Sequence, residues 1–280
     1  MRQQPFKIAV PGQKTGPAIL TVYQIDNISV AMEKRRPFVI VCGGGGYERI
    51  SDREKEPVLL QFLSCGCSAA LLEYSVGPNE FPVSLLELAS AVALARQNAR
   101  DWQIDPEKIL VCGFSAGGHL AASLGVFWDQ DFVSGPLGLT PADLRPDGQI
   151  LCYPVITSGP KAHRSSFEKL LGGRIGEEGL LEKVSLEKQV TAAVPKTFLW
   201  HTMTDETVPV ENSLLFAQAL TQAGVEYELH IYPVGGHGLS LAREETAGER
   251  AYHLQPYCSG WIDLAKAWIE LHFQCFSMKH

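Results

Sequence analysis

Short runs of apolar residues alternate with longer segments of helical, amphipathic pattern from about residue 37 to the C-terminal end of the chain. A buried strand is a short continuous apolar run, whereas a helix packed on a sheet repeats its apolar residues three and four apart. The alternation therefore favours a mostly parallel sheet with helices on both faces. The predicted strands are 37–42, 68–74, 108–112, 149–153, 196–201 and 225–232, and the predicted helices are 51–62, 82–102, 165–171, 208–223 and 260–273.

Three segments depart from this rhythm. Two apolar runs, 18–25 and 28–32, are typical of an antiparallel start to the sheet. Residues 155–194 contain glycines, charges and one short helical pattern, which indicates an insertion over the functional face. No repeat, low-complexity tract or linker divides the chain, so we expect residues 1–280 to form a single domain.

Two local signals mark the ends of the first predicted helix. Ser51-Asp52-Arg53-Glu54 has the Ser-x-x-Glu form of a capping box, in which the serine and glutamate side chains satisfy each other's backbone N–H groups. Gly66 stands where a helix C-cap favours glycine. We therefore expect a helix that begins at the box and runs through residue 62.

Composition narrows the classes of partner and compartment. The net charge of −7 and the sequence pI of about 5.6 argue against nucleic acid or an anionic membrane as a partner. The N-terminus lacks the apolar core of a signal peptide, and no window approaches the roughly 20 apolar residues of a membrane span. Seven cysteines, several of them inside predicted strands, are typical of a reducing cytoplasm, and we expect no metal site at Cys65 and Cys67.

The strongest chemical signal is Gly113-Phe114-Ser115-Ala116-Gly117, which directly follows the predicted strand 108–112. A strand that ends in Gly-x-Ser-x-Gly and opens into a helix is a nucleophile elbow. The glycines let the chain turn sharply where side chains would collide with the neighbouring strand and helix. Ser115 is therefore the candidate nucleophile, and it needs a base, an orienting acid and donors for an oxyanion.

The acid and the base are expected on loops after later strands, in the order serine, acid, histidine. Asp205 lies in the loop after strand 196–201 and is favoured over its neighbour Glu206. His237 lies between glycines in the loop after strand 225–232, so the loop can bend toward the serine. His201 is a weaker candidate base, and His119, one helical turn beyond Ser115, is interpreted as a packing residue.

Oxyanion donors are expected from the backbone N–H of Ala116 and from the glycine-rich segment 43–47. Glycines leave that backbone free to aim N–H groups at a developing negative charge. The segment has neither the Gly-Lys-Ser/Thr ending of a phosphate-binding loop nor the Gly-x-Gly-x-x-Gly spacing of a dinucleotide fingerprint.

Together these motifs resemble the α/β-hydrolase carboxylesterases related to the hormone-sensitive-lipase-like and acetyl-xylan-esterase-like enzymes of bacteria. The matching segments span residues 37 to about 240 and are 42–47, 113–119, 153–156, 201–205 and 235–238. The resemblance implies the hydrolysis of small acyl esters, acetyl esters and esters on sugars among them, with no cofactor. Relatives often carry His or Pro where this chain has Gly43, so the bracing contact of that residue is missing. The nominal loop donors are Gly44 and Gly45.

Other assignments are left with alternatives. Tyr47 is a candidate for lining the acyl or alcohol pocket, with packing as the other interpretation, and His163 is a candidate substrate contact, with a solvated loop as the other. A serine peptidase of the prolyl-oligopeptidase type shares the elbow, and a hydrolase fold kept as a binding module is the non-enzymatic alternative. Hydrolase folds of this size can also pair into a homo-oligomer through an edge strand or the closing helix.

Overall fold

The computed structural model describes residues 1–27, 34–249 and 251–274, and within these residues its centre is an eight-stranded sheet. The strand order is β1-β2-β4-β3-β5-β6-β7-β8. The pairs β1/β2 and β2/β4 are antiparallel, and every later neighbouring pair is parallel. The strands are β1 Arg2–Ile8, β2 Ala18–Gln24, β3 Arg36–Cys42, β4 Ser68–Glu73, β5 Ile104–Phe114, β6 Gly148–Cys152, β7 Lys196–Thr202 and β8 Tyr227–Tyr232.

The sheet confirms the six strands predicted from apolar runs after residue 37, and β2 confirms the predicted run 18–25. The other opening run, 28–32, lies outside the described residues. The apolar runs do not predict β1, because five of its seven residues are exposed and only Phe6 and Ile8 are partly or fully buried. Its position at the edge of the sheet tolerates both this exposure and Pro5.

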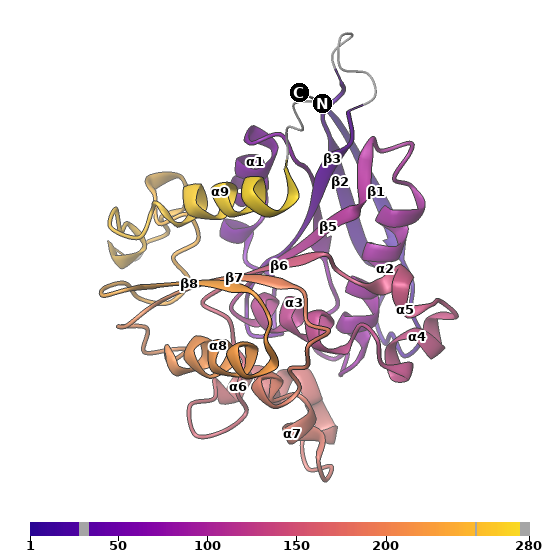
Figure 1. Cartoon of the computed structure of the whole chain (residues 1–280). Helices are drawn as coiled ribbons and strands as arrows, with labels where there is room; N and C mark the ends of the chain where they lie inside the picture. Colours follow the sequence, from indigo (N-terminus) through magenta and orange to yellow (C-terminus); the bar gives the residue numbers. More distant parts are fainter. Residues whose placement is uncertain (28–33, 250, 275–280) are drawn as a thin grey trace.

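Helices cover both faces of the sheet (Figure 1). They are α1 Glu56–Ser64, α2 Val83–Gln97, α3 Ala116–Phe127, α4 Asp131–Leu137, α5 Pro141–Leu144, α6 Arg164–Leu171, α7 Leu180–Lys183, α8 Glu211–Ala223 and α9 Trp261–Phe273. The predicted helix 82–102 ends earlier than expected, and α4 and α5 were not predicted. Among the described residues, no helix is long and apolar enough to cross a lipid bilayer.

Alternate side chains of each central strand pack into two separate hydrophobic cores, one on each face of the sheet. Val39 and Val41 of β3 pack with α1 and α9 on one face. Phe38 and Ile40 of the same strand pack with α2, α3 and α8 on the other face. Because both faces are covered, the strands are continuous apolar runs, which is why they could be read from the sequence.

The start of the first predicted helix needs a correction. Ser51 makes no side-chain capping bond, and residues 52–54 form a short 3-10 turn (η2 Asp52–Glu54) before α1 begins at Glu56. The carboxylate of Glu54 does not return to the backbone of Ser51 as a capping box requires. It accepts a hydrogen bond from the backbone N–H of Gly44 instead.

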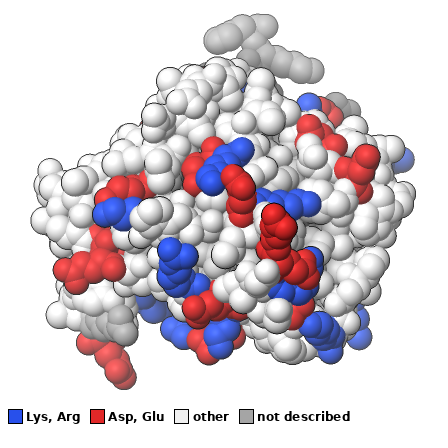
Figure 2. Space-filling model, turned by 90° about the horizontal axis from the view of Figure 1, so that it is seen from below, with Lys and Arg blue, Asp and Glu red and all other residues white. Residues whose placement is uncertain are grey.

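The segment 155–194 adds no strand to the sheet among the described residues. It carries α6, α7 and two 3-10 turns (η3 Gly172–Arg174 and η4 Leu186–Lys188). The turn η4 contacts α8, and α6 and α7 lie on the same side of the sheet as α8 (Figure 1). Phe167 and Leu170 of α6 join the core. Seen from below, acidic and basic side chains are interspersed over the surface (Figure 2). One ion pair, Lys169 with Glu48, joins α6 to the turn after the glycine loop at 3.2 Å.

Candidate active site

Ser115 occupies a sharp turn between β5 and α3. Its backbone angles, φ +53° and ψ −118°, lie in a region that side chains rarely adopt. A Cβ on Gly113 would overlap the carbonyl oxygen of Gly117, and a Cβ on Gly117 would overlap the carbonyls of Cys42 and Gly43. Both glycines are therefore required by close backbone contacts, and the turn holds the Ser115 hydroxyl at the N-terminus of α3.

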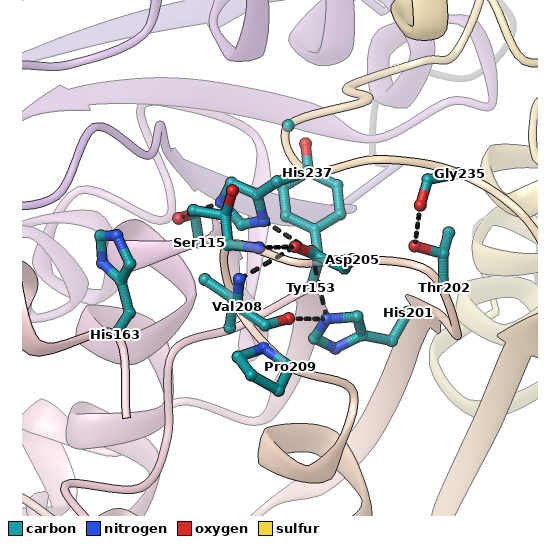
Figure 3. A network of polar contacts seen from close by, with 12 residues as sticks. Ser115, Tyr153, His163, His201, Thr202, Asp205, Val208, Pro209, Gly235 and His237 are labelled. Atoms are coloured by element: carbon teal, nitrogen blue, oxygen red, sulfur yellow. Dashed lines mark hydrogen bonds and ion pairs between the residues drawn. The ribbon is translucent and has the colours of Figure 1, made fainter. Parts of the chain in front are cut away.

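The three residues expected to act together are in hydrogen-bond contact (Figure 3). Ser115 Oγ lies 2.7 Å from His237 Nε2, and His237 Nδ1 lies 2.6 Å from Asp205 Oδ2. They come from the loops after β5, β8 and β7, whose carboxyl ends meet at one edge of the sheet. A carboxylate on Nδ1 holds the proton there, so Nε2 is free to accept the proton of the serine hydroxyl.

Asp205 is buried, whereas its neighbour Glu206 is exposed, so the geometry selects Asp205 as the partner of His237. Its other oxygen accepts the backbone N–H groups of Thr207 and Val208, both at 2.9 Å. Burial alone would raise the pKa of Asp205, but hydrogen bonds from His201 and His237 and the charge of these histidines hold it below the ordinary value. The carboxylate is therefore ionised at neutral pH.

Two other histidines near the site are held by protein groups. His201 is fully buried, its Nε2 lies 2.9 Å from the Val208 carbonyl, and its Nδ1 lies 2.8 Å from Ser213 Oγ. His119 is buried between the Tyr47 hydroxyl and the Val184 carbonyl, both at 2.9 Å. Burial lowers the pKa of His119 to about 4, so its imidazole is neutral. Neither ring contacts Ser115 Oγ.

The glycine loop after β3 departs from the nominal assignment. The N–H of Gly44 donates to Glu54 Oε2 at 2.8 Å, so it is not available to an oxyanion, and the expectation for Gly44 is wrong in this structure. Gly45 and Gly46 line the same cleft as Ser115, and their N–H groups donate no hydrogen bond within the described residues. The N–H groups of Gly45 and Gly46 therefore fit an oxyanion-donor role better than the nominal pair, Gly44 and Gly45.

Tyr47 also differs from the expectation of a substrate contact. Its side chain is buried, and its hydroxyl donates to His119 Nδ1. Its ring packs edge-on against Tyr74, whose hydroxyl donates to the Gly43 carbonyl at 2.7 Å. These contacts tie the loop to the elbow helix and to β4, so the packing interpretation of Tyr47 fits the structure.

The cleft in front of Ser115 has a volume of about 620 Å³. Its lining includes His163 and Ser165 from the insertion, and His237 and Tyr252 from the segment after β8. His163 is half-buried, and burial followed by the nearby charge of His237 lowers its pKa. The described residues contain no cluster of three or more His, Cys, Asp or Glu that could hold a metal ion.

Sequence reasoning missed two buried polar groups at the site, Glu54 and Tyr153. Glu54 has a signal of its own, a glutamate soon after the glycine loop, but its spacing from Ser51 is also that of a capping box. Tyr153 follows β6 and belongs to the matching segment 153–156, which by itself indicates no role for the side chain. Its ring lies edge-on to His237 with centroids 5.2 Å apart (Figure 3).

A serine at a strand-to-helix elbow, with an aspartate and a histidine from loops after later strands, defines an α/β-hydrolase. The BD-FAE family model matches residues 27–220. The chain belongs to the BD-FAE family. The match includes Ser115 and Asp205 and ends before His237. The assignment of His237 to the site therefore depends on its hydrogen bonds with Ser115 and Asp205.

Two curated proteins similar in sequence are named as a xylanase and an esterase. The chain is 39% identical to endo-1,4-beta-xylanase B of Butyrivibrio fibrisolvens and 27% identical to an acetylxylan esterase of Xylanibacter ruminicola, over 75% and 72% of its length. It spans only 34% and 41% of those two relatives.

Solved structures match along nearly the whole chain. The acetyl ester-xyloside bifunctional hydrolase from Caldicellulosiruptor lactoaceticus has 38% identity and a TM-score of 0.79, over 93% of this chain and 90% of that one. The carboxylesterase Cest-2923 from Lactobacillus plantarum has 27% identity and a TM-score of 0.84, over 97% and 98%. These matches confirm the predicted α/β-hydrolase fold.

Proposed function

We propose that this chain is a serine carboxylesterase that hydrolyses short-chain esters, acetyl esters in particular, through Ser115, His237 and Asp205. The observation that carries the proposal is the unbroken chain of short hydrogen bonds from Ser115 Oγ through His237 to Asp205. A serine hydroxyl becomes a useful nucleophile at neutral pH only beside an oriented base, which is what this arrangement supplies.

In the first half of the reaction, Ser115 Oγ attacks the ester carbonyl carbon while His237 Nε2 takes the hydroxyl proton. Asp205 holds the imidazole in the required tautomer and stabilises the imidazolium that forms. The tetrahedral intermediate then collapses, the bond to the alcohol oxygen breaks, and His237 gives its proton to that oxygen. The products of this half are the alcohol and an acyl group on Ser115.

The negative charge of the intermediate is bound by two backbone N–H groups, that of Ala116 and that of Gly45. Ala116 is the first residue of α3, so its N–H has no partner within the helix and the helix dipole favours an anion there. In the second half, His237 takes a proton from water, the resulting hydroxyl attacks the acyl carbon, and Ser115 leaves with that proton. The acid is released and the enzyme returns to its starting state.

The polar lining of the cleft supports a substrate whose alcohol part carries many hydroxyl groups, such as an acetylated sugar. Its lining includes charged and hydroxyl side chains from both rims, Glu48, Arg49, Ser165 and Lys169 among them. Such groups can hydrogen-bond the hydroxyls of a sugar, whereas a long acyl chain needs an apolar tunnel. Two relatives support the same choice, since one is named an acetylxylan esterase and another an acetyl ester-xyloside hydrolase.

The setting of the enzyme is also a proposal. Its cysteines support a cytoplasmic location, because Cys42, Cys112 and Cys152 are buried free thiols in neighbouring strands and serve as small apolar residues. Its substrate is a small-molecule ester, and the reaction draws on protein groups without a cofactor. Association of the chain into a homo-oligomer stays a prediction, which a measurement of the molecular mass in solution would test.

The proposal is tested by replacing the nucleophile. Ser115→Ala removes the atom that forms the acyl-enzyme, so hydrolysis of p-nitrophenyl acetate should fall by several orders of magnitude, and labelling by a fluorophosphonate probe should disappear. Ser134→Ala, a change of another buried serine in α4, is the matched control and should keep both signals. Unchanged hydrolysis by folded Ser115→Ala, or wild-type protein that neither hydrolyses the ester nor takes the label, would contradict the proposal.

A further inference from the structure

Glu54 is a carboxylate buried beside the glycine loop, with 3% of its surface exposed. Burying a carboxylate is costly unless its oxygens are hydrogen-bonded. Both oxygens accept: Oε2 from the N–H of Gly44 at 2.8 Å and Oε1 from the hydroxyl of Tyr153 at 2.6 Å. Both oxygens of Glu54 are therefore satisfied by donors from other segments of the chain.

The Tyr153 hydroxyl carries the connection further. Its oxygen accepts the backbone N–H of Ser240 at 2.8 Å, and Ser240 lies in the loop that carries His237. Ser240 Oγ in turn donates to the Arg53 carbonyl at 2.6 Å. The carboxylate therefore links the glycine loop, through one tyrosine, to the loop of the histidine. The Tyr153 ring packs against the His237 ring at the same time (Figure 3).

We propose that Glu54 is a positioning residue for the esterase reaction, which holds the glycine loop so that the N–H of Gly45 points at the oxyanion. The inference rests on the proposed function. Relatives often carry His or Pro at the position of Gly43, and glycine has no side chain to brace the loop. We assign this bracing to Glu54. Four successive glycines, 43–46, have no side chains to hold their backbone, so the loop takes its shape from contacts with its surroundings.

Two of those contacts act on adjacent residues of the loop. Tyr74 holds the carbonyl of Gly43, and Glu54 holds the N–H of Gly44. Both bonds hold the peptide unit between Gly43 and Gly44. The next peptide unit, which carries the N–H of Gly45, is held at the Gly44 carbonyl by the N–H of Ser51 at 2.8 Å. With both units held, the direction of the Gly45 N–H has little freedom left. Removing an oxyanion donor typically costs roughly 100- to 1,000-fold in kcat, and a donor that no longer points at the charge is lost in the same sense.

The test compares Glu54→Ala and Glu54→Gln with the wild type on p-nitrophenyl acetate. Glu54→Ala should lower kcat by roughly 100- to 1,000-fold while KM changes less than about threefold, because the loop donor acts on the transition state. Glu54→Gln should lose less, because its amide keeps one acceptor oxygen for one of the two donors. The affinity for a trifluoromethyl ketone, which forms a tetrahedral adduct with Ser115, should fall by the same factor as kcat/KM.

A matched control separates positioning from stability. Asp147 is a carboxylate with 6% of its side chain exposed that accepts the backbone N–H of Ile109, at the amino end of β6 and away from Ser115. Asp147→Asn should lower the melting temperature while leaving kcat within about twofold. Tyr153→Phe, which keeps the ring on His237 and removes the hydroxyl, should lower kcat and ketone affinity together, and it serves where Glu54→Ala does not fold.

One readout is independent of turnover. Amide exchange in the peptide that contains residues 43–47 should speed up in the Glu54 variants and not in Asp147→Asn, because the N–H of Gly44 loses its acceptor. Folded Glu54 variants with wild-type kcat, ketone affinity and exchange would overturn the inference while the esterase itself stands. A wild type without esterase activity would overturn the proposed function, and with it the role given to Glu54, even if exchange in the loop changes.

Discussion

At the scale of single residues, the hydrogen bonds of the Asp205 carboxylate fix the orientation of the site. Asp205 accepts from His237 with one oxygen and from two backbone N–H groups with the other, so the carboxylate cannot rotate without losing bonds. The sequence shows two adjacent acidic residues, Asp205 and Glu206, after strand β7. It does not show that Asp205 is buried and Glu206 exposed, and this difference in burial distinguishes the two candidates.

Asp205→Asn keeps the size of the side chain and removes its charge. We expect kcat on p-nitrophenyl acetate to fall on the order of 1,000- to 10,000-fold, because an amide stabilises the wrong tautomer of His237 and not the imidazolium. Glu206→Gln, at the exposed neighbour, is the control and should stay within about twofold of the wild type. Similar losses in the two variants would argue against Asp205 as the triad acid.

The same variant has a pH signature. The pKa of Asp205 is lower in the folded protein than in the unfolded chain, so the unfolded chain binds the extra proton first as the pH falls. Asp205 therefore stabilises the fold above about pH 4, and this contribution is lost as the pH drops below that value. In urea unfolding, the stability difference between wild type and Asp205→Asn should shrink from pH 6 to pH 3.

At the scale of elements, apolar runs predicted the inner strands because both faces of the sheet are covered. The same reasoning missed β1, an exposed edge strand whose pairing with β2 supplies its order. It also misplaced the start of α1, because Ser51 and Glu54 have the spacing of a capping box whichever partner the carboxylate finds. Local patterns therefore located the elements, and long-range hydrogen bonds decided some of their ends.

The elbow between β5 and α3 makes a prediction that needs only backbone contacts. In Gly117→Ala the new methyl group would overlap the carbonyls of Cys42 and Gly43, so the melting temperature should fall by several degrees and activity should drop with it. Gly176→Ala, in the turn between η3 and α7, meets no atom within 4 Å beyond its chain neighbours and should leave the free energy of unfolding unchanged or raise it by up to about 1 kcal/mol. Equal effects at the two glycines would contradict the close approach of β3 to the elbow.

At the scale of the whole molecule, the cleft is assembled from segments far apart in the chain. The glycine loop, the insertion and the loop after β8 each contribute to its walls, and each is positioned by the sheet and by α3. Substrate preference is therefore a property of the assembled fold. The polar lining leads us to expect short acyl groups on hydroxyl-rich alcohols.

We expect kcat/KM to fall steeply as the acyl chain of p-nitrophenyl esters grows beyond four carbons, and acetylated xylo-oligosaccharides to be deacetylated. His163 faces the cleft from the insertion, so His163→Ala should raise KM for the acetylated sugar several-fold more than KM for p-nitrophenyl acetate. Arg164→Ala, an exposed neighbour outside the lining, is the control. A preference for long chains, or equal changes in the two KM values, would count against this assignment.

The sequence by itself determined the class of fold, the elbow at Ser115 and the order of its partners, because these follow from local apolar period and from motifs that the turn requires. Only the tertiary structure decided that the N–H of Gly44 has an acceptor inside the protein and that the Tyr47 side chain is buried. It also decided that Glu54 leaves its own turn to hold Gly44. The physical reason is that a buried polar group takes whichever partner the fold brings within reach, and the distance along the chain does not limit it: Glu54 bonds Gly44, ten residues away, and Tyr153, 99 residues away.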